Sequence, residues 1–234
     1  MASVLKVDKL DPQSGTALEI GTSGDTITIP SGATIVNSGT ATGFGGGDLS
    51  FGGDTFGADQ TVGANDAYAF SLETSGNVAI KMDASGHVTK PLQSCCCVRM
   101  NANMSALGSS STTDIVFDTE RFDVNADFNT TNYTFTAPVT GKYLVQYQVR
   151  LDMMDIDAGY YQLSIVSSNA TYNTTFDPDG FDKDPDYYSF TGGLLIDMDA
   201  SDTCKFQIVQ NAGAAVAVVV GGASDTYASI GLLC

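Results

Sequence analysis

Five aspartates on one short segment form the densest group of metal-ligand oxygens in the chain. They surround Gly180 and comprise Asp177, Asp179, Asp182, Asp184 and Asp186. Calcium takes about six to eight oxygen ligands, so a loop of this composition is a candidate calcium site and calcium is the one candidate cofactor. The segment lacks the closing glutamate and the ordering of an EF-hand loop. A solvated acidic loop is the simpler interpretation, and an exposed recognition loop is a third.

The residues needed for catalysis are sparse. His87 is the only histidine, and it lies in a turn-like segment after a Ser-Gly pair. A Ser-His-Asp arrangement therefore has no good candidate, and no phosphate-binding glycine motif follows a strand and opens a helix. Carboxylates such as Asp152, Asp155 and Asp157 are typical of surface charge in the absence of a cleft signal. The sequence predicts a protein that is not an enzyme, with no catalytic residues.

The cysteines are Cys95, Cys96, Cys97, Cys204 and Cys234. No Cys-x-x-Cys spacing occurs, which argues against a zinc site. Buried free thiols are the favoured interpretation, because we expect synthesis in a host cytoplasm, where thiols stay reduced. Residues 1–12 alternate charged with apolar residues and lack the apolar core of a signal peptide.

The net charge of −17, from 27 acidic and 10 basic residues, argues against nucleic-acid binding, because such a surface repels phosphate backbones. The longest apolar run, 212–222, is too short to cross a bilayer, so we expect no membrane insertion. Its valines predict a buried strand instead.

Strand patterns dominate the second half of the chain. Tyr143, Val145, Tyr147 and Val149 alternate with Leu144, Gln146, Gln148 and Arg150, which is the period of a half-buried strand. Residues 134–136 are typical of a strand end, and 137–141 of a turn. Further β-rich segments are 160–166, 190–196, 205–209, 216–220 and 227–233. The pattern predicts an all-β sandwich or jelly roll.

A longer spacing pattern includes that strand. It comprises Phe117, Asp123, Phe128, Phe135, Gly141, Tyr143, Val145 and Tyr147. The pattern resembles the signature of the globular head of complement 1q and its relatives in the tumour necrosis factor superfamily. The one departure is Val145, where the signature has Phe. The resemblance covers roughly residues 97–234 and implies a ten-stranded jelly-roll knob, here placed at 95–234, that forms a homotrimer.

The resemblance also implies roles for individual residues. It places Phe117, Phe128, Phe135, Tyr143, Val145 and Tyr147 in the jelly-roll core. It leaves Leu144, Gln146 and Tyr227 as candidates for the trimer interface. The two termini of such a domain lie side by side, so a disulfide between the triplet of cysteines and Cys234 is a second possibility beside free thiols.

The N-terminal third differs in composition. A Ser-Gly pair recurs at 23–24, 75–76 and 85–86 between short apolar alternations, a pattern that predicts strand, tight turn, strand. Residues 39–63 hold nine glycines, typical of a flexible or extended connector. Residues 2–10 and 24–30 resemble the N-terminal anchors of tail-fibre and other virion proteins of aquatic bacteriophages. We therefore expect a virion-anchoring arm at 1–45 and a glycine-rich, β-hairpin stem at 46–94.

The leading hypothesis is a non-enzymatic bacteriophage virion protein, either a tail fibre or spike or a capsid decoration protein. Its expected partners are two further copies, other capsid or tail proteins bound through residues 1–45, and a glycan or protein on the host surface. The alternative is a secreted, lectin-like recognition module of the complement 1q type. Against it stand the missing signal peptide and the missing Gly-x-y stalk. A glycan-degrading tailspike enzyme is disfavoured by the small size.

Overall fold

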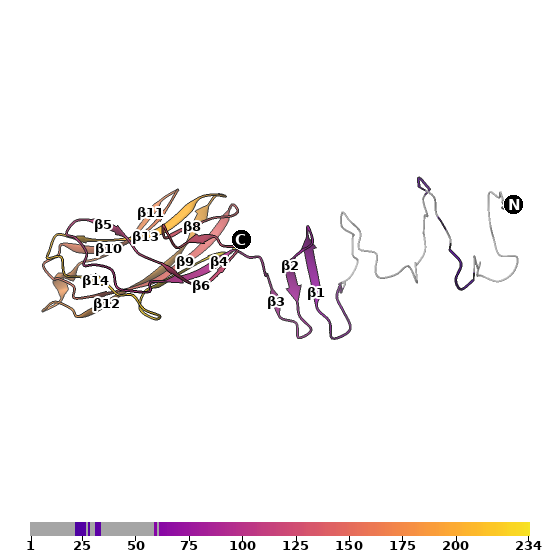
Figure 1. Cartoon of the computed structure of the whole chain (residues 1–234), viewed down its shortest axis with the longest axis horizontal. Coiled ribbons are helices and arrows are strands. Elements are labelled where there is room, and N and C mark those ends of the chain that lie inside the picture. The colour runs from indigo at the N-terminus through magenta and orange to yellow at the C-terminus, as the bar shows by residue number, and fades with distance from the viewer. Residues whose placement is uncertain (1–21, 27, 29–30, 34–58, 60) are drawn as a thin grey trace. The chain divides into compact units, whose positions relative to one another are not determined.

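The computed structural model describes residues 22–26, 28, 31–33, 59 and 61–234 (Figure 1). The chain divides into two units, Met1–Thr61 and Val62–Cys234. The predicted anchoring arm and most of the glycine-rich connector lie outside the described residues. In the first unit, the described part of the first Ser-Gly repeat is a turn, in which the Asp25 carboxylate accepts hydrogen bonds from the backbone and hydroxyl of Thr22.

A three-stranded antiparallel sheet opens the second unit. Its strands are β1 (Phe70–Thr74), β2 (Asn77–Met82) and β3 (Val88–Thr89). Ser75 and Gly76 connect the first two strands with positive φ angles of 50° and 76°, as a tight hairpin requires. The strand-turn-strand prediction is thus confirmed for the second and third Ser-Gly repeats.

The turn between β2 and β3 is organised by Asp83. Its Oδ1 accepts hydrogen bonds from the backbone N–H groups of Ser85 and His87, and its Oδ2 lies 2.9 Å from His87 Nδ1. The hydrogen bond with the His87 ring is the main reason why the pKa of Asp83 is lowered. The only histidine of the chain therefore lies in an exposed turn, hydrogen-bonded to the carboxylate that orders it.

The jelly roll follows and has two antiparallel sheets. The first, here called the β9 sheet, has the strand order β12 (Tyr187–Met198), β9 (Gly141–Asp152), β15 (Tyr227–Leu232), β4 (Cys95–Arg99) and β6 (Thr119–Val124). A short strand outside this order, β14 (Val218–Val219), also pairs with β9. The second, the β13 sheet, has the order β11 (Thr171–Phe176), β10 (Tyr160–Ser167), β13 (Thr203–Asn211), β8 (Thr134–Thr136), β7 (Phe128–Asn129), with β5 (Thr112–Asp114) also paired to β13. A 3-10 turn, η1 (Pro178–Gly180), interrupts the acidic loop.

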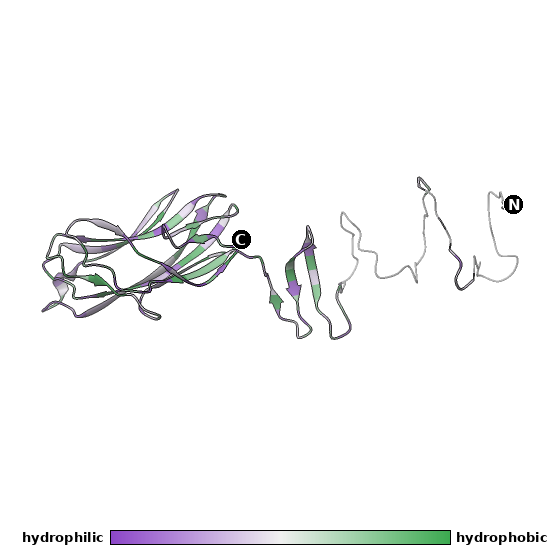
Figure 2. Cartoon of the chain, in the orientation of Figure 1, coloured by the Kyte–Doolittle hydropathy of each residue, from purple (hydrophilic) through white to green (hydrophobic). Residues whose placement is uncertain are grey.

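The core lies between these sheets. Phe117 packs edge-on against Phe206 with ring centroids 5.3 Å apart, and Phe135 packs against Tyr143 at 5.6 Å. Along β9 the odd-numbered residues from Tyr143 to Leu151 are buried, while the even-numbered ones face outward. Figure 2 shows the resulting alternation of hydrophobic and hydrophilic residues along the strands.

The chain passes repeatedly from one sheet to the other, for example from β9 to β10 and from β11 to β12, so most neighbouring strands are not consecutive. Two five-stranded paths arranged in this way form the all-β jelly-roll sandwich that the sequence predicted. No helix in the described part of the chain is long and apolar enough to cross a membrane.

The prediction of a buried strand over 212–222 needs correction. Only Val218 and Val219 form a strand, and residues 212–216 lie in a largely exposed loop. Gly213, with φ of 76°, and Ala212, with φ of 59°, turn the backbone out of an extended conformation there. The prediction followed the apolar composition of the segment and overlooked Gly213, which is itself a turn signal.

Candidate functional site

Three residues predicted to form an interface, Leu144, Gln146 and Tyr227, share the outward face of the β9 sheet. Leu144 lies on β9 between Leu195 of β12 and Gly231 of β15. Leu144 and Leu195 are 40% and 49% exposed. Single exposed leucines are ordinary, but two opposite each other on one sheet face form a continuous apolar strip.

The next row across the face consists mainly of short, uncharged side chains. Gln146 lies between Gly193 and Ser229, and Ser229 in turn lies opposite Cys97 of β4. Phe122 of β6 ends this row and is 51% exposed. Short side chains in the middle of the row leave room for another protein surface to approach the backbone closely.

Tyr227 anchors a third row. It lies between Gln148 and Arg99, and its hydroxyl donates to Gln148 Oε1 at 3.3 Å. The guanidinium of Arg121 lies over its ring, 5.6 Å from the centroid. Tyr227 is half-buried and held from two sides, so it presents a rigid aromatic edge of the kind enriched at protein interfaces.

Charged pairs flank this neutral centre. At one end Lys142 Nζ lies 2.6 Å from Asp197 Oδ1. At the other end Arg150 bonds both Asp152 and Asp225 at 2.8 Å. The Leu144 and Gln146 rows thus form an apolar and neutral centre, with paired charges at two ends and Arg99 and Arg121 beside Tyr227. An uncharged centre with charges around it suits protein–protein contact.

Two cysteines lie on the same face. Cys95 and Cys97 point outward and are partly exposed, whereas Cys96 between them is buried in the sandwich. All five cysteines of the chain lie in its described part and are free. Burial, reinforced by the nearby Asp123 charge, raises the pKa of the Cys96 thiol, and burial raises the pKa of Cys204 to about 12.

The structure places the residues singled out from the sequence as follows. Leu144 and Gln146 face outward on β9, and Tyr227 shares that face. Six aromatic or apolar residues expected in the core are buried between the sheets: Phe117, Phe128, Phe135, Tyr143, Val145 and Tyr147. Leu195, Phe122 and Arg121 were not predicted, since their position on this face depends on strand pairing far apart in sequence.

The five aspartates of the acidic loop are not brought together. Asp177 Oδ1 accepts a hydrogen bond from the backbone N–H of Asp179 and thereby begins η1. Asp184 Oδ1 accepts one from the backbone of Ile156 on a different loop. Among the residues that the structure describes, no three His, Cys, Asp or Glu side chains are grouped as a metal ion requires.

A shallow hollow of about 210 Å³ lies where β9 ends and β12 begins. Its lining residues are Asn103, Asp152, Met153, Asp186, Tyr187 and Val218. The Arg150 guanidinium lies 4.8 Å from the centroid of the Tyr187 ring, and its bonds to Asp152 and Asp225 raise its pKa. The contact between Arg150 and Tyr187 could not be predicted from the sequence, because 36 residues lie between them and only the register of two long strands brings them together.

Comparisons with known proteins find similarity to solved structures. No protein-family model matches the chain, and no curated protein matches it. Among solved structures it is similar to murine APRIL, at 13% identity over 60% of this chain and 99% of that one, with a TM-score of 0.45. It is also similar to the globular domain of zebrafish complement 1qA, at 18% identity over 59% of this chain and 94% of that one, with a TM-score of 0.41. The PRD1 vertex protein P5 is similar at 9% identity over 61% of this chain and 99% of that one, with a TM-score of 0.42.

The strand order of the two sheets is that of an all-β jelly-roll sandwich. The low identities and TM-scores of the solved structures carry no information about function. The function must therefore be argued from the surface of this chain.

Proposed function

We propose that this chain is a non-enzymatic virion structural protein that assembles as a homotrimer through the outward face of its β9 sheet. The observation that carries the proposal is the uncovered row of Leu195, Leu144 and Gly231, beside Phe122 and Tyr227. Identical faces on identical chains satisfy one another in a closed cyclic assembly. Three copies follow from the sequence signature around residues 117–147, which resembles that of trimeric heads.

The virion role is supported by the N-terminal sequence. Residues 2–10 and 24–30 resemble the anchors of bacteriophage fibre and capsid proteins, so we assign residues 1–45 to docking on the capsid or the tail. The protein then serves as a fibre, spike or decoration protein. The net charge of −17 supports a role in protein rather than nucleic-acid contact.

The two ends of the jelly roll suit a projecting knob. Cys95 pairs with Gly231 near the C-terminus, whereas Asp152 pairs with Tyr187 at the opposite ends of the strands. The hollow beside Tyr187 therefore lies at the end away from the connection to β1–β3. An exposed tyrosine with carboxylate and amide neighbours suits contact with a host-surface glycan or protein, because its ring offers apolar area and its neighbours offer hydrogen bonds.

Deletion of residues 1–45 tests the virion role. The truncated protein should remain a folded trimer, because every jelly-roll strand lies C-terminal to the deletion. Purified particles made with it should lack the protein. Normal incorporation would show that the knob or stem docks instead, and failure of even the intact protein to join particles would favour the recognition-module alternative.

The interface is tested by charge substitution. Leu144→Asp with Leu195→Asp should convert the trimer into monomers, since two carboxylates per copy would have to be buried. Met153→Asp with Val216→Asp is the matched control, because both residues are exposed and apolar but lie in loops away from this face. A trimer that survives the first pair and dissociates with the second would place the interface elsewhere.

A further inference from the structure

The three-stranded sheet β1–β2–β3 has one apolar face and one polar face. Phe70 pairs with Met82, Leu72 with Ile80, and Met82 with Val88, so these five side chains lie on the same side of the sheet. On the other side Ser71 pairs with Lys81, and Lys81 with Thr89. The alternation is that of a sheet which buries one face.

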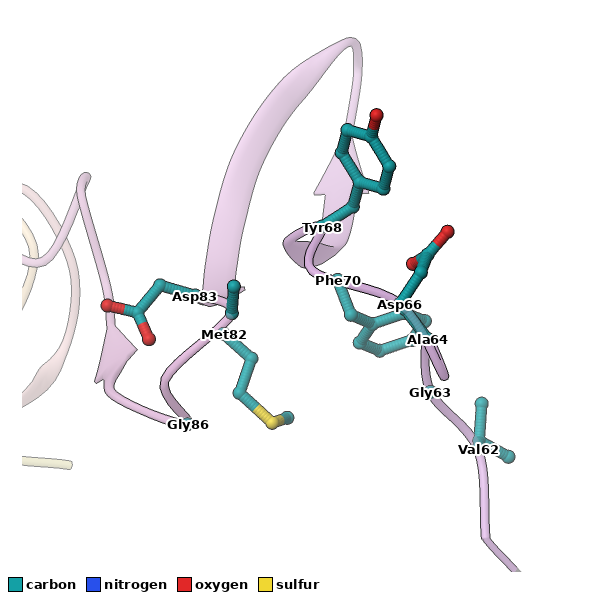
Figure 3. A pocket seen from close by; sticks show the side chains of 10 residues that line it. Val62, Gly63, Ala64, Asp66, Tyr68, Phe70, Met82, Asp83 and Gly86 are labelled. Atoms are coloured by element: carbon teal, nitrogen blue, oxygen red, sulfur yellow. The ribbon is translucent and has the colours of Figure 1, made fainter.

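Nothing within the described part of the chain buries that face. None of residues 61–93 is buried, and Leu72 and Val88 are 51% and 60% exposed. Phe70 and Met82 line an open hollow of about 240 Å³ beside residues 62–68 (Figure 3). A small sheet needs its hydrophobic face covered to be stable, so an uncovered face of five apolar residues requires a partner.

We propose that this apolar face packs against the same face in other copies of the chain, which makes residues 70–89 a second subunit contact. The proposal rests on the trimer proposed above, because that assembly brings the copies together. Residues 90–94 are the only link to β4, and at about 3.3–3.6 Å per residue six steps span at most about 20 Å. Copies joined through the β9 sheets thus hold their β1–β3 sheets at a high effective concentration.

The chemistry of the face fits an identical partner. All five side chains are uncharged, while each copy as a whole carries a charge of −17. An apolar contact is the kind that such mutually repelling chains can form without burying like charges. The reverse face, with Ser71, Lys81 and Thr89, remains in water when the apolar faces meet.

Trypsin supplies a direct assay on the full-length protein. Lys81 lies in β2, and it is the one cleavable site between Lys9 and Arg99, because Lys90 precedes Pro91 and trypsin does not cut before proline. Cleavage needs local unfolding of the strand, so its rate reports whether the sheet is held by a partner. We expect Lys81 to resist cleavage in the wild-type trimer.

Two double variants each add two carboxylates to one face of the β1–β3 sheet. Leu72→Asp with Val88→Asp should accelerate cleavage at Lys81 at least tenfold while light scattering still gives the trimer mass. Ser71→Asp with Thr89→Asp adds the same charge to the polar face and should leave cleavage slow. Leu144→Asp with Leu195→Asp, which dissociates the knob, should also expose Lys81.

The outcomes separate the two proposals. A wild-type trimer whose Lys81 is cut as fast as in the Leu72→Asp, Val88→Asp protein would overturn the second contact and leave the knob interface standing. Resistance of Lys81 that persists in the dissociated knob variant would show that the same chain covers its own sheet, which also overturns this inference. A wild-type protein that is itself monomeric would overturn the proposed trimer.

Discussion

Two tyrosines of β9 make hydrogen bonds through their hydroxyls to other segments of the jelly roll. Tyr143 donates to the carbonyl of Val139 at 2.7 Å and so secures the turn that precedes the strand. Tyr147 lies 2.6 Å from the Thr174 hydroxyl on β11, which joins the two sheets. The aromatic rings fill the core while the polar ends satisfy groups at its boundary, as buried tyrosines generally do.

Removing the first of these hydroxyls should measurably weaken the fold. Tyr143→Phe should lower the free energy of unfolding by about 1 kcal/mol, because the Val139 carbonyl loses its hydrogen bond in a part-buried site. Chemical denaturation provides the measurement. Tyr160→Phe is the control, since the Tyr160 hydroxyl has no hydrogen bond among the described residues; an equal loss in both proteins would contradict the assigned role.

Thiol labelling tests the surface at single-residue resolution. In the assembled protein Cys234 should react rapidly, while Cys95 and Cys97 should react slowly because a neighbouring copy covers them. Cys96 and Cys204 should react only on unfolding, since burial raises their pKa values and the thiolate is the reactive form. In the Leu144→Asp, Leu195→Asp protein, Cys95 and Cys97 should become fast. Rapid labelling of both in the wild type would argue against a covered face.

Calcium should leave the melting temperature unchanged. The acidic loop uses Asp177 and Asp184 to accept backbone hydrogen bonds and does not group its carboxylates. A ligand that binds only the native state would raise the melting temperature by mass action. A rise with calcium that disappears in Asp179→Asn with Asp182→Asn would instead establish a calcium site.

At the scale of the strand, Gly192 and Gly193 let β12 pass close to β9. A Cβ at Gly192 would lie 2.6 Å from the Tyr147 hydroxyl oxygen, so the tyrosine ring occupies the space that a side chain would need. Gly192→Ala should therefore cost about 1–3 kcal/mol of stability and disturb the bond to Thr174. Thermal unfolding measures the loss, and Gly180→Ala serves as the control variant because a Cβ at Gly180 would meet no atom within 4 Å. Equal melting temperatures for the two variants would be the contrary result.

Strands in which apolar and polar residues alternate clearly could be predicted from the sequence, and strands with mostly polar residues could not. The alternation over 143–149 predicted β9 because each buried residue is apolar. Strand β11, with the sequence TYNTTF, was missed because its inward side carries only Tyr172 and Phe176 with the polar Thr174 between them, which is too few apolar residues to mark a period. Strand β6 was missed because a bulge opposite Cys97 and Val98 leaves three successive residues exposed.

The same limit applies to the candidate site. Leu144, Gln146 and Tyr227 were chosen from the sequence through the resemblance to the complement 1q signature, and the period of β9 agrees with outward positions for Leu144 and Gln146. Leu195 joins them only by pairing with Leu144, about 50 residues away in the chain, and Phe122 only by pairing with Cys97, about 25 residues away. Single-sequence patterns do not give strand register. The hollow beside Tyr187 was missed for the same reason.

At the scale of the whole molecule, each copy has two uncovered apolar faces joined by five residues. One lies on the β9 sheet around Leu144 and Leu195, and the other lies on β1–β3. Because the charge of −17 per copy opposes association, the proposed contact between copies depends on apolar burial. The proposed assembly would cover both faces.

Light scattering on the purified full-length protein tests this account most directly. At micromolar concentration the mass should be about three times 24.4 kDa, and the Leu144→Asp, Leu195→Asp protein should fall to the mass of one copy. A stable wild-type monomer at that concentration would contradict it.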